Sequence, residues 1–126
     1  MKSKPKTYDE AIEMIENNNE IFGDYIVEVF EDYETLALAD DDGWTVAHEQ
    51  ASFHWTTEDK RILKLADKNG MRVAHTQAHW SGWTTTDPDI LALAMKDGWT
   101  VADEIKRYKH EQGKWLIDIE KKNKRE

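Results

Sequence analysis

The chain has 126 residues, no cysteine and a net charge of −9. This length suits a single domain over residues 1–126, and the lack of cysteine excludes disulfides, cysteine-based zinc sites and cysteine nucleophiles. No apolar run approaches the length of a membrane span, and acidic rather than apolar residues follow the basic N-terminus, which argues against a secretory signal. We therefore expect a cytoplasmic protein.

The negative charge is concentrated in the first third of the chain. Residues 1–50 carry 14 acidic and 3 basic side chains, residues 51–100 carry six of each, and residues 101–126 carry six acidic and eight basic ones. The first third repels a phosphate backbone, so direct nucleic-acid binding is not expected. It suits either a basic protein surface or a solvated acidic face that only keeps the chain in solution.

Apolar residues near the N-terminus recur at helical spacing. They are Ala11, Ile12, Met14 and Ile15, followed by Ile21, Phe22, Tyr25, Ile26, Val27, Val29 and Phe30. This pattern predicts one or two acidic capping helices over residues 7–35.

Three copies of one sequence unit follow over residues 36–106. Their glycines, Gly43, Gly70 and Gly98, lie 27 and 28 residues apart. A near-constant period of this size predicts stacked supersecondary units that share a continuous core, with end units that differ because they face water.

Each unit is predicted to run helix, turn, helix, turn. An Asp-Gly or Asn-Gly turn ends one helix, because glycine takes the left-handed conformation at little cost. Thr45 and Thr100 then stand where a helix N-cap is wanted, and a Thr-rich turn leads to the second helix, which Thr57 or Asp87 would cap. The second helix is expected to extend to the Leu-x-Leu pair, which includes Leu65 in the middle unit.

The last part of the chain, residues 107–126, is predicted to be a basic capping helix and tail. Gly113 separates Tyr108 from the apolar residues Trp115, Leu116 and Ile119. We expect one helix to end near this glycine and a separate closing helix to follow it.

The segment over residues 40–51 resembles the start of an ankyrin repeat, which reads Asp-x-x-Gly-x-Thr-Pro-Leu-His-x-Ala. Asp40, Gly43, Thr45 and His48 occupy the matching places, although all three copies lack the family's proline and are shorter than its ~33 residues. Alanine also replaces the family's leucine in each copy, Arg72 replaces threonine in the second copy, and Met95 and Asp103 replace aspartate and histidine in the third. The resemblance implies an all-α, helical-repeat solenoid with capping helices at both ends.

The resemblance also implies roles for particular residues. His48 and His75 match the family's structural histidine, which ties neighbouring turns together by hydrogen bonds. The two residues before each glycine and the one after it match positions that face partners. In this chain they are Asp41, Asp42, Trp44, Lys68, Asn69, Met71, Lys96, Asp97 and Trp99. Trp44, Met71 and Trp99 would form a row that suits a protein-binding hot spot, and the alternative is that they fold back as core.

Histidines offer an alternative site. His75 and His79 are four residues apart and His54 precedes them, so a small metal-binding protein or enzyme that uses them with nearby carboxylates is the second hypothesis. No zinc-protease glutamate follows His75, and the chain has no nucleophile elbow and no phosphate-binding glycine loop. We therefore expect no enzyme activity, no metal and no cofactor.

Three further tryptophans, Trp55, Trp80 and Trp83, fall near the predicted turns. They could form an aromatic site for a small ligand. Trp55 and Trp83 recur at matching repeat positions, which favours core instead.

Together these patterns predict a non-catalytic protein–protein interaction module whose partner has a basic patch. It would act as an inhibitor or adaptor, for example by covering a nucleic-acid-binding groove of the partner with acidic groups. The third hypothesis is a self-assembling repeat protein, in which the acidic end of one chain meets the basic end of the next. The oligomeric state is left open, and no membrane partner is expected.

Overall fold

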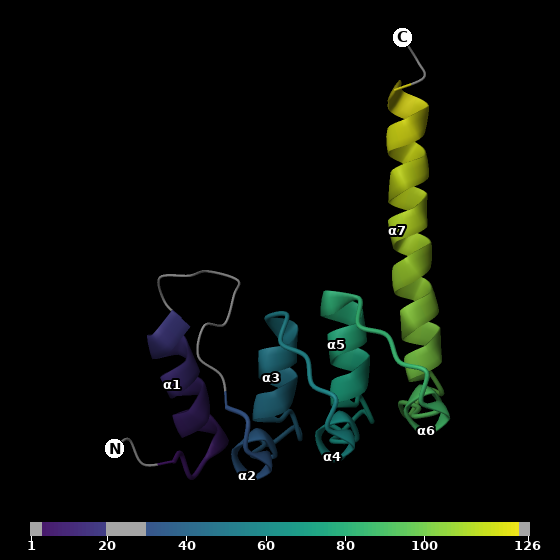
Figure 1. The fold of residues 1–126 in the computed structure, drawn as a ribbon. Coiled ribbons are helices and arrows are strands. Elements are labelled where there is room, and N and C mark those ends of the chain that lie inside the picture. Colours follow the sequence, from purple (N-terminus) through teal and green to yellow (C-terminus); the bar gives the residue numbers. More distant parts are fainter. Residues whose placement is uncertain (1–3, 20–29, 124–126) are drawn as a thin grey trace.

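The computed structural model describes residues 4–19 and 30–123, and this part of the chain is all-α, as expected. Its helices are α1 (Tyr8–Asn19), α2 (Tyr33–Leu36), α3 (Val46–Ser52), α4 (Lys60–Leu63), α5 (Val73–Ser81), α6 (Pro88–Leu91) and α7 (Val101–Asn123). α1, α3, α5 and α7 stand side by side in chain order, and the one-turn helices α2, α4 and α6 lie along one end of this row (Figure 1). α1 lies within the predicted N-terminal cap, and any second helix over residues 20–29 falls outside the described residues.

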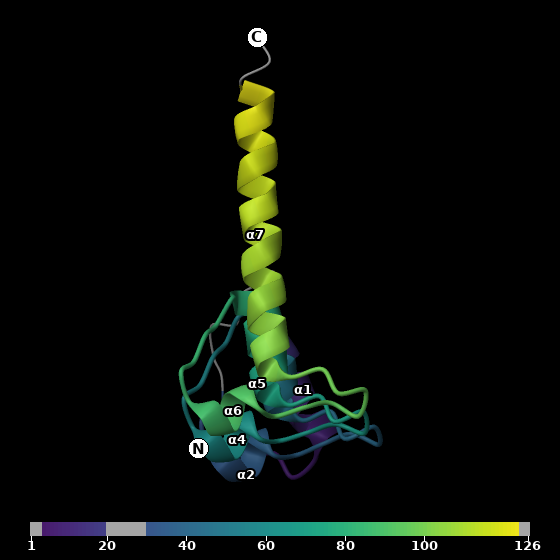
Figure 2. The ribbon, with the colours of Figure 1, turned by 90° about the vertical axis from the view of Figure 1, so that its right-hand side faces the viewer.

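The pairs α2–α3, α4–α5 and α6–α7 share one local structure. In each pair the short helix leads into a hairpin turn closed by an isolated antiparallel bridge. The bridges are Ala39 to Thr45, Ala66 to Arg72 and Ala94 to Thr100. We call residues 37–45, 64–72 and 92–100 the first, second and third hairpin turns, and all three project to the same side of the row (Figure 2).

Aspartates begin the three one-turn helices. The carboxylates of Asp32, Asp59 and Asp87 each accept a backbone N–H from the first turn of the helix that follows. Asp87 caps α6 as expected, but the cap of α4 is Asp59 rather than Thr57. The Thr57 hydroxyl instead accepts the Asp59 N–H at 3.1 Å, in the turn that precedes the cap.

The second helix of each unit is shorter than expected. Leu65 and Leu93 lie beyond the ends of α4 and α6, and their carbonyls accept the N–H groups of Val73 and Val101 at 3.0 Å. These carbonyls belong to the hairpin turn, so the helix ends before them.

Buried apolar side chains fill the space between neighbouring units. One cluster holds Ala11, Ile15, Leu36, Val46, Ala47, Ala51, Ile62 and Val73, and the other holds Leu63, Ala74, Ala78, Ile90, Val101 and Ile105. The alanines of α3 and α5 allow these helices to pack closely. Each buried leucine, isoleucine or valine contributes roughly 1.5–3 kcal/mol to the free energy of folding.

Two histidines link consecutive units. His48 Nδ1 accepts the Thr45 N–H, so its Nε2–H donates to the carbonyl of Met71 at 2.8 Å. His75 makes the same bond to the carbonyl of Trp99 at 3.1 Å. Each of these histidines therefore ties its own turn to the next one by a hydrogen bond. In the last unit Asp103 stands in the histidine's place and its carboxylate accepts the Thr100 N–H.

α7 is one continuous helix, contrary to the expected break near Gly113. A glycine inside a helix costs only about 1 kcal/mol relative to alanine, and no proline follows it. The helix extends well past the row formed by its neighbours (Figure 1). Among the described helices, none is both long enough and apolar enough to cross a membrane.

Candidate protein-binding groove

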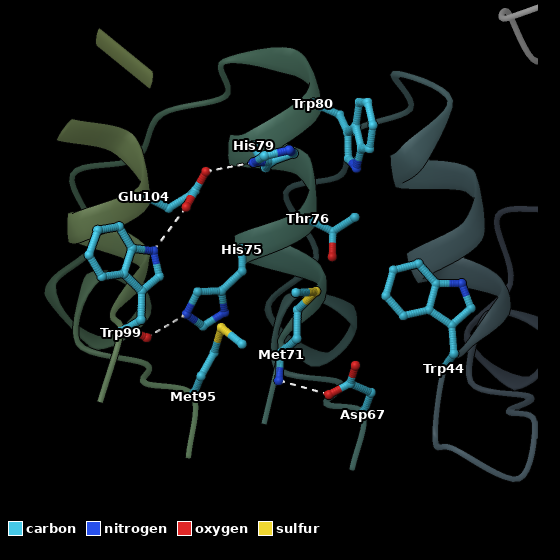
Figure 3. A pocket seen from close by; sticks show the side chains of 10 residues that line it. All are labelled: Trp44, Asp67, Met71, His75, Thr76, His79, Trp80, Met95, Trp99 and Glu104. Carbon is cyan, nitrogen blue, oxygen red and sulfur yellow. Dashed lines mark hydrogen bonds and ion pairs between the residues drawn. The ribbon is translucent and has the colours of Figure 1, made fainter. Parts of the chain in front are cut away.

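A groove of about 300 Å³ lies over α5, on the side of the hairpin turns. Its lining residues are Trp44, Asp67, Met71, His75, Thr76, His79, Trp80, Met95, Trp99 and Glu104. Figure 3 shows Trp44 at one end and Trp99 at the other, with Met71, His75 and Thr76 between them. All three units therefore contribute to the site.

The two end walls are tryptophan rings that carboxylates hold in place. Trp44 Nε1–H donates to Glu49 Oε2 at 2.9 Å, and Trp99 Nε1–H donates to Glu104 Oε2, also at 2.9 Å. The Trp44 ring also packs against the His48 ring, with 4.7 Å between centroids. Because these bonds already restrict the rings, little side-chain entropy remains to be lost when a ligand binds.

The floor of the groove differs from its walls because the middle unit lacks the hydrogen-bonded tryptophan and glutamate that the two outer units have. Met71 and Thr76 occupy the positions that tryptophan and glutamate hold in the outer units. Both are smaller than the residues they replace, and Thr76 is turned back to the carbonyl of Arg72 at 3.3 Å. A hollow therefore lies between Trp44 and Trp99.

The third hairpin turn adds another apolar group to the lining. In the first two turns an aspartate Oδ1, from Asp40 or Asp67, accepts two backbone N–H groups of its own turn. Met95 takes that position in the third turn, where Asp97 Oδ1 accepts the Trp99 N–H at 2.9 Å instead. A carboxylate thus still bonds the backbone of this turn, and the Met95 side chain lines the groove instead.

Glu104 is a buried carboxylate in the groove that three other side chains contact by hydrogen bonds. It is only 7% exposed and accepts hydrogen bonds from Trp99, His79 and Arg107, the last at 2.6 Å. Burial alone would raise the pKa of Glu104, but these hydrogen bonds and the Arg107 charge outweigh it and lower the pKa. The carboxylate is therefore ionised, and Arg107 compensates its charge.

The three predicted hot-spot residues do come together. Trp44 and Met71 are half-buried, and Trp99 is 38% exposed, so the row lies at the surface of the stack rather than within its core. The other six predicted site residues do not line the groove. Asp41, Asp42, Lys68, Asn69, Lys96 and Asp97 are exposed at the tips of the hairpin turns.

The tips bind one another instead. The Lys68 N–H donates to the Asp42 carbonyl at 2.8 Å, and the Lys96 N–H donates to the Asn69 carbonyl at 2.9 Å. Lys68 Nζ also pairs with the Asp42 carboxylate at 2.9 Å.

Sequence reasoning missed several residues of the groove. Thr76, Met95 and Glu104 were not identified as lining, and Trp80 was grouped with core tryptophans although it is 48% exposed. Trp55 and Trp83 do pack against the two cores, as their repeat positions favoured. Comparing the units position by position would have shown that the Trp–Glu pair is absent from the middle one.

The histidines suggested as metal ligands have other contacts. His75 uses both ring nitrogens, accepting the Arg72 N–H and donating to the Trp99 carbonyl, and His79 bonds to Glu104. Among the described residues, no group of three or more histidine, aspartate or glutamate side chains is arranged to hold a metal ion.

Comparison of the chain with protein-family models, curated proteins and solved structures found no match. The residues of the groove therefore carry the functional conclusion.

Proposed function

We propose that this protein is a non-catalytic protein-binding module that holds a segment of a partner in the groove over α5. One observation carries the proposal. The middle unit has Met71 and Thr76 where the outer units have a Trp–Glu pair, which leaves a hollow between two indoles that are already held in place.

The exposed aromatic surface supports this function. Trp80 and Trp99 are 48% and 38% exposed and lie on one groove. Tryptophan is enriched among residues that dominate binding energy, especially beside pockets from which a partner excludes water. The groove is at the lower end of the volume range of small-molecule sites, so it suits one or two side chains of a larger partner.

The scaffold we propose is an ankyrin-like repeat stack over residues 36–106, capped by α1 and by the later part of α7. The recurring bridge, the recurring aspartate cap and the histidine bond to the next turn support it. In such a stack each unit binds its neighbours, and one face of several units forms a shared binding surface.

The partner we propose carries a basic patch, so that the protein acts as an adaptor or an inhibitor. The excess of acidic side chains in residues 1–50 favours such a surface and repels nucleic acid. The absence of cysteine fits a reducing compartment, and we propose the cytoplasm.

The test compares partner capture from host lysate by the wild-type chain and by a Met71→Trp, Thr76→Glu variant. This variant installs in the middle unit the pair that the outer units already have, so it fills the hollow with side chains that the scaffold accommodates elsewhere. We expect unchanged helical circular dichroism and loss of the partner.

The control is Tyr33→Ala, which removes an aromatic ring of similar exposure, 37%, from α2. It should retain the partner. If the filled variant does not fold, a Trp80→Ala, Trp99→Ala variant provides the same comparison, because both rings are exposed. A partner held equally well by the folded groove variants and by the wild type would refute the proposal.

A further inference from the structure

We infer that the groove takes a basic segment of another protein, with a large apolar side chain in the hollow over Met71 and Thr76 and an arginine or lysine lying along Trp44 toward Asp67 and Glu49. This inference rests on the proposed function and adds the chemistry and direction of the bound segment.

The hollow itself selects an apolar side chain. Met71 and Met95 line it with thioethers, and Trp99 lines it with an indole whose N–H is already bonded to Glu104. Thr76 directs its hydroxyl to the Arg72 carbonyl. These groups offer a ligand apolar surface and few free donors, and methionine adapts its shape to aromatic or branched groups.

Charge is distributed unevenly along the groove. At the Trp99 end, Glu104 is bonded by Arg107 through two nitrogens, at 2.9 and 2.6 Å, so its charge is compensated. At the Trp44 end, Asp67 lines the groove and Glu49 holds the indole. Among the side chains that the structure describes, no lysine or arginine forms an ion pair with Asp67 or Glu49.

Lys68, in the second hairpin turn, forms its ion pair with Asp42 at 2.9 Å. Asp40 and Asp67 act on Lys68 only as more distant charges, and neither is ion-paired with it. Burial raises the pKa of the Tyr8 hydroxyl in α1, and the charges of Glu49 and Asp40 raise it further. The potential at this end of the groove is therefore negative.

Trp44 supplies the surface for the cation. An indole is the strongest aromatic partner for a cation, and an arginine guanidinium both stacks on a ring and forks onto a carboxylate. Among the described residues that line the groove none is a lysine or arginine, and Arg107 stands beside it only at the opposite, Trp99 end. Acidic segments and nucleic acid are disfavoured by the same field.

The experiment selects a phage-displayed random peptide library on the wild-type chain and counter-selects it on the Met71→Trp, Thr76→Glu variant. We expect the enriched peptides to share an aromatic or large aliphatic residue with an arginine or lysine a few positions away. Synthetic peptides from the selection are then measured by calorimetry.

Charge variants test the direction of binding. An Asp67→Asn, Glu49→Gln variant keeps the acceptor oxygens that bond the turn and the Trp44 indole but removes both charges. We expect it to weaken binding by about tenfold, an effect that added salt reduces. The matched control Asp97→Asn makes the same change in the third hairpin turn, where Asp97 has the same kind of backbone bond, and should bind like the wild type.

The outcomes separate the two proposals. The inference fails if the peptides prefer the wild type to the filled variant but lack a basic residue. It also fails if they bind equally well after the Asp67 and Glu49 changes. In both cases the proposed function of the groove still stands. Peptides that match this chain, together with a concentration-dependent mass, assign the groove to a second copy and also overturn it. If no peptide distinguishes the wild type from the filled variant or from Trp80→Ala, Trp99→Ala, both proposals fail.

Discussion

At the scale of single residues, the histidines of the first two units explain how turns are held in register. Each accepts the N–H of its own cap residue through Nδ1 and donates through Nε2 to a carbonyl of the next turn. This arrangement requires the neutral ring. If Nδ1 were protonated, it could no longer accept the backbone N–H of the cap residue, and the two hydrogens would repel each other.

This chemistry predicts a dependence of stability on pH. Burial lowers the pKa of both His48 and His75, although bonds to the next turn and nearby carboxylates oppose it. The unfolded chain, with histidine pKa values near 6.5, therefore binds more protons than the folded one as the pH falls below this value. We expect the free energy of unfolding to fall between about pH 7 and pH 5, measured by urea denaturation.

A His48→Gln, His75→Gln variant should be less stable at neutral pH. Its free energy of unfolding should also change less between about pH 7 and pH 5. His110→Gln, which removes an exposed histidine from α7, should keep the wild-type slope. If the double variant kept the full slope, other groups would be responsible for the dependence.

At the scale of elements, the hairpin turns both link the units and supply half of the residues that line the groove. All three contain a glycine with positive φ, 79° in Gly43, 80° in Gly70 and 91° in Gly98. The first two glycines also face the backbone of the next turn. A β-carbon on Gly43 would lie 3.1 Å from the Asp67 α-carbon, and one on Gly70 would lie 3.0 Å from the Lys96 nitrogen.

The third glycine differs because no unit follows it. A β-carbon on Gly98 would have nothing within 4 Å. We expect Gly98→Ala to cost about 1–2 kcal/mol from the left-handed conformation alone. Gly43→Ala and Gly70→Ala should each cost more, because the next turn must also move.

Thermal or urea unfolding of the three variants, compared with the wild type, measures this order. Equal costs at all three positions would mean that close packing between turns adds nothing to the strain of a positive φ.

At the scale of the whole molecule, charge runs from an acidic N-terminal third to a basic C-terminal end. Head-to-tail assembly through these ends is the main competitor to a groove that binds another protein. Surface ion pairing weakens as salt screens it.

The two ideas predict different masses in solution. If the groove serves another protein, we expect one mass by sedimentation or light scattering at roughly 20 mM and 300 mM salt, because the screening length changes several-fold over this range. A mass that falls as salt is added, and rises with protein concentration, would support assembly between the ends. An Asp9→Asn, Glu13→Gln variant, which removes two exposed acidic charges from α1, would then reduce the mass at low salt.

Several features of the fold were predictable because their causes are local. The all-α class followed from helical spacing and from caps such as Asp87. The places of the hairpin turns followed from Gly43, Gly70 and Gly98, where a side chain would be strained. Helix ends were less predictable, because carbonyls such as that of Leu65 bond to the next element rather than to their own helix.

The candidate site divides in the same way. By itself the sequence determined the composition of each unit, and so the row of Trp44, Met71 and Trp99 at equivalent turn positions. Only the tertiary structure decided that this row borders a groove, and that Trp80 on α5 and Glu104 on α7 line it with the row. The physical reason is that the groove forms where the smaller side chains of the middle unit lie beside the larger ones of the outer units. Only the packing of all three units side by side creates that space.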